Sequence, residues 1–404
     1  MSGTATDLSI TWVDLHQTSA SSLDDWHHLA TTTGSDMWFT PAWVERWVRH
    51  FAKNRHAIAG CAFWGDGLVG VLPFVIDTIY PFGLPVKVAQ LAGPHPLFGV
   101  MRLPILAEHE RAMLDQIVDQ FFEHHRCDCV SLAPISNAFN LADRVRATLD
   151  SNAIASLNPD SKARNHTIIR LPSSFEDYLK TLSRNRRNKY RKTKRVLEDD
   201  HNVSTRIFNG RSTRKMLGKF TSAHEAQWQA KGKLGHFADW RGSHDFYADL
   251  SESGTDRAGV RLYVQQTPDQ EIVTGLFCFA AGKSCHALVP SRNNDWSELR
   301  LDIGLHAQFE RIENLINDGI DIIDSGAGEY DYKASLKGET VEMHRFLVSR
   351  PTMIGRFKMN ALRRYGEALN FLYYRIWYNK AAPWLRRKGL HVGGLWNSWI
   401  RTRV

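Results

Sequence analysis

The sequence predicts an α/β protein of the α+β kind. It should consist of two similar halves, each a mixed and mostly antiparallel sheet flanked by helices, followed by a basic helical tail. Three observations support this. The 404 residues exceed one ordinary domain, two distant segments share one pattern of strands and helices, and much of the positive charge lies near the C-terminus. We expect domains at 1–155, 165–350 and 351–404.

The repeated segments begin with a β-hairpin. Residues 56–76 read as two strands joined by a glycine-containing turn at 65–67, and residues 261–281 read the same way with a turn at 268–270. The returning strand of each hairpin carries an apolar-Gly-apolar step, at Gly70 and Gly275. The two hairpins therefore predict equivalent elements of two halves.

A helix and a strand follow each hairpin, which strengthens the case for duplication. They are predicted at 112–125 and 127–135 in the first half, and at 302–318 and 319–328 in the second. A hairpin followed by a helix is common in any α/β protein. Here both the order and the spacing recur, which favours a duplicated fold.

Two connections complete this organisation. The polar, turn-rich segment 151–166 is a candidate linker between the halves. The Pro- and Gly-rich segment 79–99 interrupts the first half and is predicted to be a loop, either covering a site or lying on the surface.

Composition and termini indicate a cytoplasmic protein. The chain is 43% apolar and has five cysteines without a CxxC pair, which fits reduced thiols. Its N-terminus lacks the basic start and apolar run of a secretory signal. No uninterrupted apolar stretch reaches the roughly eighteen residues of a membrane span.

The net charge of +8 is concentrated in two segments. Residues 350–404 carry +11 and the run Arg184–Arg195 carries +8, so the remainder of the chain is strongly acidic. Charge localised in this way suggests anionic partners at two places.

The first basic segment is predicted to be a helix with one face packed inward. Phe175, Tyr178, Leu179 and Leu182 recur at helical spacing, and Tyr190 roughly continues that face. A charged helix face is usually just solvated. However, eight cations without an intervening acid repel one another unless an anion is nearby. We interpret the run as an anion- or substrate-binding surface, with these candidate residues: Arg184, Arg187 and Arg191.

A second candidate site follows the strand that ends near Asp324. Glycines at 326 and 328 permit a sharp turn, and Tyr332 and Lys333 come directly after it. A simple turn needs neither two glycines nor a cluster of ionisable groups, so the segment is predicted to be functional.

Two further segments carry candidate site residues. His224, Glu225 and Trp228 fall on a probable helix, where a packed His–Trp pair is as plausible as a substrate wall. Beyond them, a helix start near Gly304 offers backbone N–H groups that suit a pyrophosphate, unless Asp302 is only its N-cap. The residues assigned to that start are Arg300, Ile303, Gly304 and Leu305.

No metal site is predicted. The segment EHHRCDC at 123–129 lacks the CxxC spacing and the second ligand pair of a zinc site. The sequence also contains no GxSxG, P-loop or GxGxxG motif.

Taken in order, these motifs resemble the CelD/BcsL-type acetyltransferases of the GNAT superfamily, relatives of the FemAB-type transferases. The resemblance covers most of residues 20–350. Its second-half features are Leu182-Ser183 followed by the basic run from Arg184, His224 with Trp228, the Gly275 hairpin, the Gly304 helix start, and Asp324 ahead of Tyr332-Lys333. Its first-half features are Phe39, Pro41, Trp43, Trp47 and the stretch 67–73.

The resemblance implies two GNAT-like halves and acyl transfer from acetyl-CoA or another acyl-CoA to a primary amine, by direct attack in a ternary complex. A general base must then deprotonate the amine, and the candidates in order of preference are Glu225, Asp324 and Tyr332. The Gly304 helix would bind the pyrophosphate. Lys333 or the basic run would meet further phosphate charge.

One departure from the family keeps other donors open. The usual acyl-CoA signature has Arg or Gln three positions before its first glycine, whereas Arg300 precedes Gly304 by four and the second small residue is absent. An aminoacyl-tRNA donor of the FemAB kind therefore remains an alternative, as does a catalytically idle binding protein.

The tail alternates cations with tryptophans, namely Trp377, Trp384, Trp396 and Trp399. Such composition is typical of interfacial helices on anionic lipid, and equally of a helical extension packed on the body. The first interpretation predicts peripheral attachment to the inner membrane face. It would also suit an amine-bearing acceptor from envelope or exopolysaccharide biosynthesis.

Overall fold

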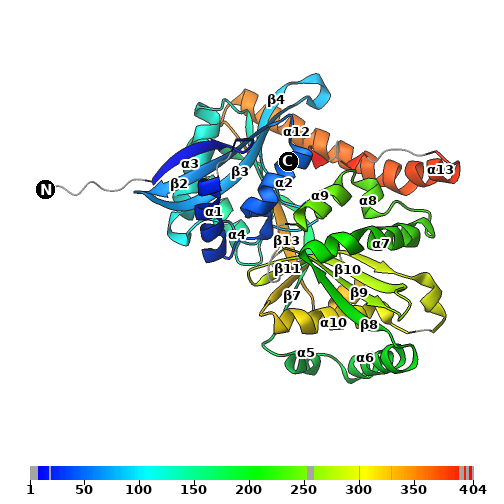
Figure 1. Ribbon diagram of the computed structural model, residues 1–404. Coiled ribbons are helices and arrows are strands. Elements are labelled where there is room, and N and C mark those ends of the chain that lie inside the picture. The colour runs from blue at the N-terminus through cyan, green and yellow to red at the C-terminus, as the bar shows by residue number, and fades with distance from the viewer. Residues whose placement is uncertain are drawn as a thin grey trace. The chain divides into compact units, whose positions relative to one another are not determined.

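The computed structural model describes residues 8–17, 20–95, 97–252, 259–299, 301–328, 330–390, 395–396 and 400–402. The chain forms two compact units (Figure 1). The first comprises Met1–Asn165, Val341–Asn370 and Ser398–Val404, and the second comprises His166–Thr340 and Phe371–Asn397. Each unit combines a mixed sheet with flanking helices, so the predicted fold class is confirmed.

The first unit contains a sheet in the order β1-β2-β3-β4-β5-β13, with the short strand β6 paired to β13. Its elements are β1 (Leu8–Asp14), α1 (Ala20–Thr32), η1 (Met37–Phe39), α2 (Pro41–Phe51), β2 (His56–Trp64), β3 (Gly67–Ile79), η2 (Pro81–Gly83), β4 (Val86–Leu91), η3 (Ala107–His109), α3 (Glu110–Glu123), β5 (Cys129–Ser136), α4 (Leu141–Ser151), β6 (Ser156–Leu157), β13 (Glu339–Ser349) and most of α12 (Met353–Phe371).

The second unit contains a sheet in the order β7-β12-β11-β10-β9-β8. Its elements are β7 (Lys162–Arg170, which begins in the first unit), α5 (Phe175–Thr181), α6 (Arg184–Arg195), η4 (Val196–Asp200), β8 (Ser204–Asn209), α7 (Gly210–Gln229), α8 (His236–Asp239), α9 (Ser243–Leu250), β9 (Gly259–Gln266), β10 (Ile272–Ala281), β11 (Ser284–Arg292), η5 (Asn294–Leu299), α10 (Ile303–Asn317), β12 (Ile322–Ala327), α11 (Asp331–Ser335), η6 (Leu372–Ala381) and α13 (Ala382–Arg387).

The internal repeat is confirmed. In the first unit β2, β3 and β4 form an antiparallel meander, and α3 leads to β5, which pairs with β4 in parallel. In the second unit β9, β10 and β11 form the same meander, and α10 leads to β12, which pairs with β11 in parallel. Both predicted hairpins are present. Gly65 (φ 60°) turns the first and Gln270 (φ 64°) lies in the turn of the second.

One predicted loop is wrong. Segment 79–99 contains β4, the third strand of the first meander. The glycines and prolines that suggested a loop flank this strand rather than interrupt it, and β4 is only six residues long. A short buried strand between turn residues lacks the period-two pattern by which exposed strands are identified.

Helices cover both faces of the second sheet. Alternate residues of β10 point to opposite sides, and Leu276 and Cys278 pack in a cluster with Phe309 of α10. On the other face Phe277 stacks with Phe220 of α7 at a centroid distance of 6.1 Å. Figure 1 shows α7 and α10 on opposite sides of this sheet. At Gly275 an added Cβ would lie 2.6 Å from the Phe220 ring, which explains the glycine of the hairpin.

The basic run forms α6 with the expected buried face. Tyr190 is 6% exposed, and its hydroxyl donates to Glu310 Oε1 at 2.9 Å. The preceding helix α5 begins after Ser174, whose Oγ accepts from the Asp177 N–H at 3.1 Å.

The tail is helical from 353 to 387, as predicted. Of its tryptophans, Trp396 is buried and Trp384 is half-exposed, while Trp399 lies outside the described residues. In the described chain, no helix combines the length and apolarity needed to span a membrane.

Candidate active site

The parallel strands β11 and β12 separate after a short paired stretch. Their register runs from Ser284↔Ile322 to His286↔Asp324 and then ends. Beyond this point β12 pairs with β7, while β11 continues along β10. The register between β10 and β11 also shifts, since Val289 opposes Phe277 and Ala287 opposes Cys278, leaving Leu288 as a β-bulge. The bulge changes the direction of β11 just beyond His286, where its edge is no longer paired with β12.

A cavity of about 40 Å³ lies where the strands separate. Strands β10 and β11 and the bulge form its apolar wall, and polar groups reach it from α10, β12 and α11. The polar side chains are Gln308, Arg311, Ser325 and Tyr332. Among the described lining residues none is a carboxylate.

Arg311 is the least expected of these residues. It lies on α10, is 2% exposed, and its Nε is buried without a hydrogen-bond partner. In the described part of the chain no carboxylate forms an ion pair with its guanidinium. A buried charge without a partner is costly. Arg311 therefore gives the cavity a positive charge that an anionic group could neutralise.

Tyr332 lies on the short helix α11 and is 45% exposed, with one side lining the cavity. Burial raises the pKa of its hydroxyl, the positive charge of Arg311 lowers it, and neighbouring Tyr330 raises it, for a net increase. The hydroxyl therefore remains protonated near neutral pH and can donate a proton.

The N-terminus of α10 lies at the start of the helix that carries Arg311. Ile303 and Leu305 are buried and anchor this end, whereas a Cβ added at Gly304 would meet no atom within 4 Å. Asp302 is the N-cap but makes no side-chain capping bond. The backbone N–H groups of this first turn are thus accessible beside Gly304. Arg300 lies outside the described residues.

Helix α6 places cations beside this helix start. Lys189 Nζ lies 3.0 Å and an Arg186 nitrogen 3.6 Å from Asp302 Oδ2. Of the predicted anion-binding residues, Arg184 and Arg191 are exposed. Arg187 instead donates to the Leu182 carbonyl at 2.5 Å, at the end of α5. The α6 cations and the free end of α10 therefore form one positively charged surface.

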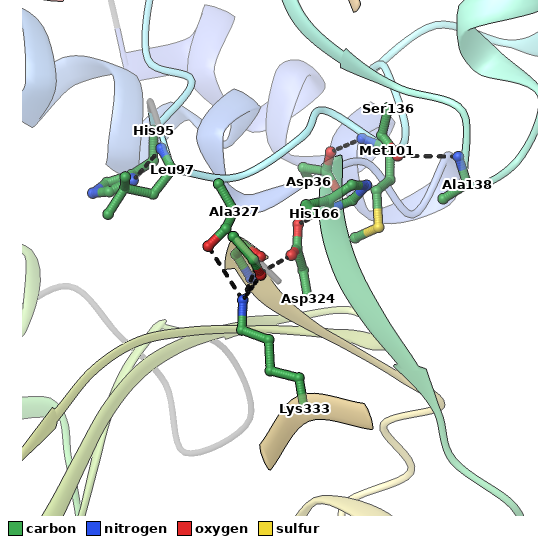
Figure 2. A network of polar contacts seen from close by, with 12 residues as sticks. Asp36, His95, Leu97, Met101, Ser136, Ala138, His166, Asp324, Ala327 and Lys333 are labelled. Carbon is green, nitrogen blue, oxygen red and sulfur yellow. Dashed lines mark hydrogen bonds and ion pairs between the residues drawn. The ribbon is translucent and has the colours of Figure 1, made fainter. Parts of the chain in front are cut away.

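Asp324 is fully buried and lies at the last paired position of β12. His166 Nδ1 donates to its Oδ2 at 2.9 Å, and the Gly326 N–H donates to its Oδ1 at 2.7 Å (Figure 2). Burial alone would raise the pKa of Asp324, but His166, His286 and the Gly326 N–H lower it. Asp324 is not among the residues lining the cavity, and it holds the strand end from which the turn departs.

Lys333 is 2% exposed and points into the same turn. Its ammonium donates to the carbonyls of Gly326, Ala327 and Gly328 at 2.8, 3.2 and 2.9 Å (Figure 2). Burial lowers its pKa to about 8, although Asp324 raises it. These contacts use all three of its protons, so in this structure Lys333 fixes the glycine turn before Tyr332.

Glu225 is bound to a neighbouring helix. Its Oε1 accepts from the Ala238 N–H at 3.1 Å, and the N–H groups of Gly235 and Phe237 also contact the carboxylate. It thus caps the start of α8. Burial raises its pKa more than these bonds lower it.

His224 supports the bulged strand from behind. Its Nδ1 donates to the Pro290 carbonyl at 2.9 Å, and its Nε2 accepts from the His236 N–H at 3.1 Å. Burial lowers its pKa to about 4, which keeps the ring neutral. Trp228 packs beside it at a ring distance of 6.0 Å. Because Pro290 lines the cavity, His224 positions the wall of the site.

The structure also assembles a group that the sequence pattern does not reveal. Ligand atoms of Glu198, His306 and Glu310 come within 4.8 Å of one another. Lys194 Nζ lies 3.7 Å from Glu198 Oε1 and 3.4 Å from Glu310 Oε1, so one ammonium already pairs with both carboxylates and offsets part of their charge.

Comparisons with known proteins find similarities that include this region. The family described as "Acetyltransferase (GNAT) domain" matches residues 184–334. A structure described as FemX is similar with a TM-score of 0.60 and 12% identity, over 83% of this chain and 96% of that one. The L-PGS structure from Bacillus licheniformis gives a TM-score of 0.48 and 10% identity, over 86% and 96%. No match was found among curated proteins.

At such low identity the FemX likeness concerns the fold alone, and it extends over both halves of the chain. The family match covers the segment in which β11 and β12 separate. Residues 184–334 are therefore similar to the acetyltransferase (GNAT) domain family, and the chain as a whole shares the fold of FemX.

Proposed function

We propose that the protein is an N-acyltransferase that transfers an acyl group, most simply acetyl, from acyl-CoA to a primary amine. One observation carries the proposal: the cavity at the separation of β11 and β12 contains a protonated tyrosine and an unpaired buried arginine. The thioester would lie against the released edge of β11. Acyl transfer generates negative charge on the carbonyl oxygen and on the departing thiolate. The arginine can stabilise the first, and the tyrosine can protonate the second.

The reaction would proceed by direct attack. The amine nitrogen bonds to the thioester carbonyl carbon, and the carbonyl oxygen becomes an oxyanion that the Arg311 charge stabilises. The C–S bond then breaks, and the Tyr332 hydroxyl donates its proton to the departing thiolate. The proton of the attacking amine passes to solvent water, from which Tyr332 regains its own.

The acceptor amine would react as its free base. Glu225 and Asp324, the first two candidates for the general base, do not line the cavity, and both are hydrogen-bonded elsewhere. We therefore propose positioning roles for them and for His224 and Lys333. Since an amine has a pKa of about 10, the rate should increase with pH over the neutral range.

The CoA phosphates would bind at the start of α10. Accessible N–H groups and the positive end of the helix dipole suit a pyrophosphate, and α6 adds Arg186 and Lys189 nearby. On binding, these two cations would exchange Asp302 for phosphate oxygens.

Substitution of Gly304 by alanine tests this assignment. The free protein should become more stable by up to about 1 kcal/mol, because alanine favours the helix and its methyl group meets open space. Acetyl-CoA should nevertheless bind about tenfold more weakly, since the methyl group occupies the approach to the backbone N–H groups.

Calorimetric titrations of the wild type and this variant with acetyl-CoA and desulfo-CoA would measure both effects. Micromolar binding to the wild type is expected. Equal affinity of the variant would contradict the assigned phosphate site.

A second donor is favoured by the exposed face of α6. Arg184, Arg191, Lys192 and Arg195 are exposed and unopposed by acids within this helix, as a tRNA backbone would require. A titration with charged tRNA distinguishes the donors. Salt-sensitive tRNA binding without CoA binding would replace acyl-CoA by aminoacyl-tRNA. An absence of binding to either would support the idle binding protein.

We further propose that the chain is of the CelD/BcsL type and acts on an envelope or exopolysaccharide amine at a membrane surface. The tail supports this. At the start of α12, Met353, Ile354 and Phe357 are 90%, 71% and 65% exposed, beside exposed Arg356. Exposed apolar side chains next to a cation fit the surface of an anionic lipid bilayer.

Vesicle sedimentation tests the membrane proposal. The protein should bind phosphatidylglycerol-containing vesicles and not purely phosphatidylcholine ones, and high salt should weaken the binding. Changing Met353, Ile354 and Phe357 together to glutamine should abolish it. Ile207→Gln removes an exposed apolar residue of β8 and should have no effect. Binding that survives the triple substitution would exclude this patch as the contact.

A further inference from the structure

The first unit repeats the strand separation that forms the cavity of the second. Strands β4 and β5 pair in parallel only from Val88↔Cys129 to Gln90↔Ser131. After that β4 ends at Leu91, while β5 continues along β13. A cavity of about 90 Å³ lies at this point, bordered by the end of β4 and the middle of β5. The duplicated fold therefore has a cavity at the equivalent place in each half.

The lining of this second cavity differs chemically from that of the first, because it has several arginines instead of one. Four arginines reach it from four separate segments: Arg55 before β2, Arg164 on β7, Arg345 on β13 and Arg401 near the C-terminus. Its described lining contains no carboxylate, histidine, cysteine or tyrosine. Apart from the Ser131 hydroxyl, the described lining offers no nucleophile, and it offers no ordinary acid or base. The arginines indicate a binding site for negative charge.

One carboxylate beside the cavity neutralises part of this charge. Asp77, which is 8% exposed, forms an ion pair with Arg55, and its Oδ1 lies 3.4 Å from an Arg401 nitrogen. Because one carboxylate serves two guanidinium groups, this trio retains a net positive charge.

Arg345 has no such partner. In the described chain no carboxylate lies within ion-pair distance of it. The nearby Glu367 is bonded to Arg363 at 2.9 Å and lies 3.7 Å from Arg364. Burial and the charge of Arg164 lower the pKa of Arg345 to about 10, with Glu367 acting in the opposite direction. The guanidinium groups of Arg164 and Arg345 therefore both border the cavity, and the charge of Arg164 disfavours that of Arg345.

The size and the donors of the cavity fit a phosphate group. A volume of about 90 Å³ is several times the roughly 10–15 Å³ that one water molecule needs. Guanidinium groups bind phosphate through paired N–H···O bonds. Phosphate carries up to two charges on one tetrahedral group, which matches convergence of arginines from different directions better than a single carboxylate does.

We infer that the cavity between β4 and β5 is a binding site for a phosphate or diphosphate group of a small molecule, held by Arg345 and Arg164 with Arg55 and Arg401 at its rim. The inference does not depend on the proposed acyl-CoA reaction. It assigns to the first half a ligand site of its own, equivalent in topology to the acyltransferase cavity and different in chemistry.

The test compares wild type with Arg345→Gln in calorimetric titrations with inorganic phosphate and pyrophosphate. Saturating desulfo-CoA is present, so that any pyrophosphate site at α10 is filled. Wild type should bind pyrophosphate, and the variant should bind it at least about tenfold more weakly. Arg111→Gln removes an exposed arginine of α3 outside the cavity and serves as the matched control.

Thermal unfolding separates binding from a structural role. Since Arg345 has no partner to lose, its replacement should leave the unfolding temperature of the free protein unchanged or higher, and should remove the increase that pyrophosphate produces. A lower unfolding temperature with an intact pyrophosphate response would overturn the inference. So would an absence of phosphate and pyrophosphate binding to wild type, or a preference for a dicarboxylate such as succinate.

If the protein binds no CoA, the same titrations are run without desulfo-CoA. Loss of pyrophosphate binding in Arg345→Gln would then still support the site in the first half. Failure of the proposed reaction and failure of this site are thus observed separately.

Discussion

Replacing Tyr332 by phenylalanine should lower kcat by about 10²- to 10³-fold and leave the KM for acetyl-CoA nearly unchanged. A departing thiolate leaves more readily when it is protonated as the C–S bond breaks, and general acid catalysis typically contributes effects of this size. Tyr332 lines the cavity, and the net increase in its pKa keeps its proton available. Phenylalanine preserves the ring and removes only the proton donor.

Tyr330→Phe is the matched control. Tyr330 is 60% exposed, stacks on Tyr332 at 6.0 Å, and is not among the residues lining the cavity. Steady-state rates with acetyl-CoA and an amine acceptor should fall for Tyr332→Phe alone. Equal losses in both variants would show that the effect comes from packing rather than proton transfer.

The pH profile provides a second measurement of the same role. Because burial raises the pKa of Tyr332 above its usual value near 10, the acid form persists across the neutral and mildly alkaline range. For the wild type kcat/KM should rise with pH as the amine loses its proton, with no descending limb below pH of about 10. A descending limb near pH 8 would assign the proton to a different donor.

The fold was predictable because each copy of the repeat is marked by patterns within a short stretch of sequence. Hairpins with a glycine in the returning strand, each followed by an amphipathic helix, appear as period-two and period-3.6 patterns within short windows. Strand β4 was not predictable in this way. It is short, and its residues do not alternate simply between buried and exposed positions, as expected of a strand whose two faces are both covered.

The candidate site was only partly predictable, because sequence does not show which way an ionisable side chain points. The sequence places a cluster of ionisable groups at and after Asp324, yet of these only Tyr332 reaches the cavity, while Asp324 and Lys333 both bind the backbone of the glycine turn. Burial forces most ionisable groups to bind the backbone or each other. Arg311 gave one usable signal, a cation on the apolar face that includes Phe309, Ile312 and Leu315.

Replacing Arg311 by methionine should have opposite effects on stability and activity. The buried guanidinium has no ion-pair partner in the described chain, so removing it should raise the free energy of unfolding by about 1–2 kcal/mol. The kcat should fall by about 10²-fold or more, because the oxyanion loses its stabilising charge. Chemical denaturation and steady-state kinetics on one preparation would measure both.

Arg261→Met is the informative comparison, since Arg261 is also buried, at 3% exposed, but forms an ion pair with Asp318. That substitution removes the ion pair with Asp318, which is 42% exposed, and the hydrogen bond with Tyr263, and should destabilise the protein by about 1 kcal/mol. A loss of stability in Arg311→Met like that in Arg261→Met would mean that Arg311 has a structural partner and no role in the reaction. If Arg311 serves to stabilise the transition state, Arg311→Met should gain stability and lose activity. The unpaired charge of Arg311 does not stabilise the folded protein in the absence of substrate.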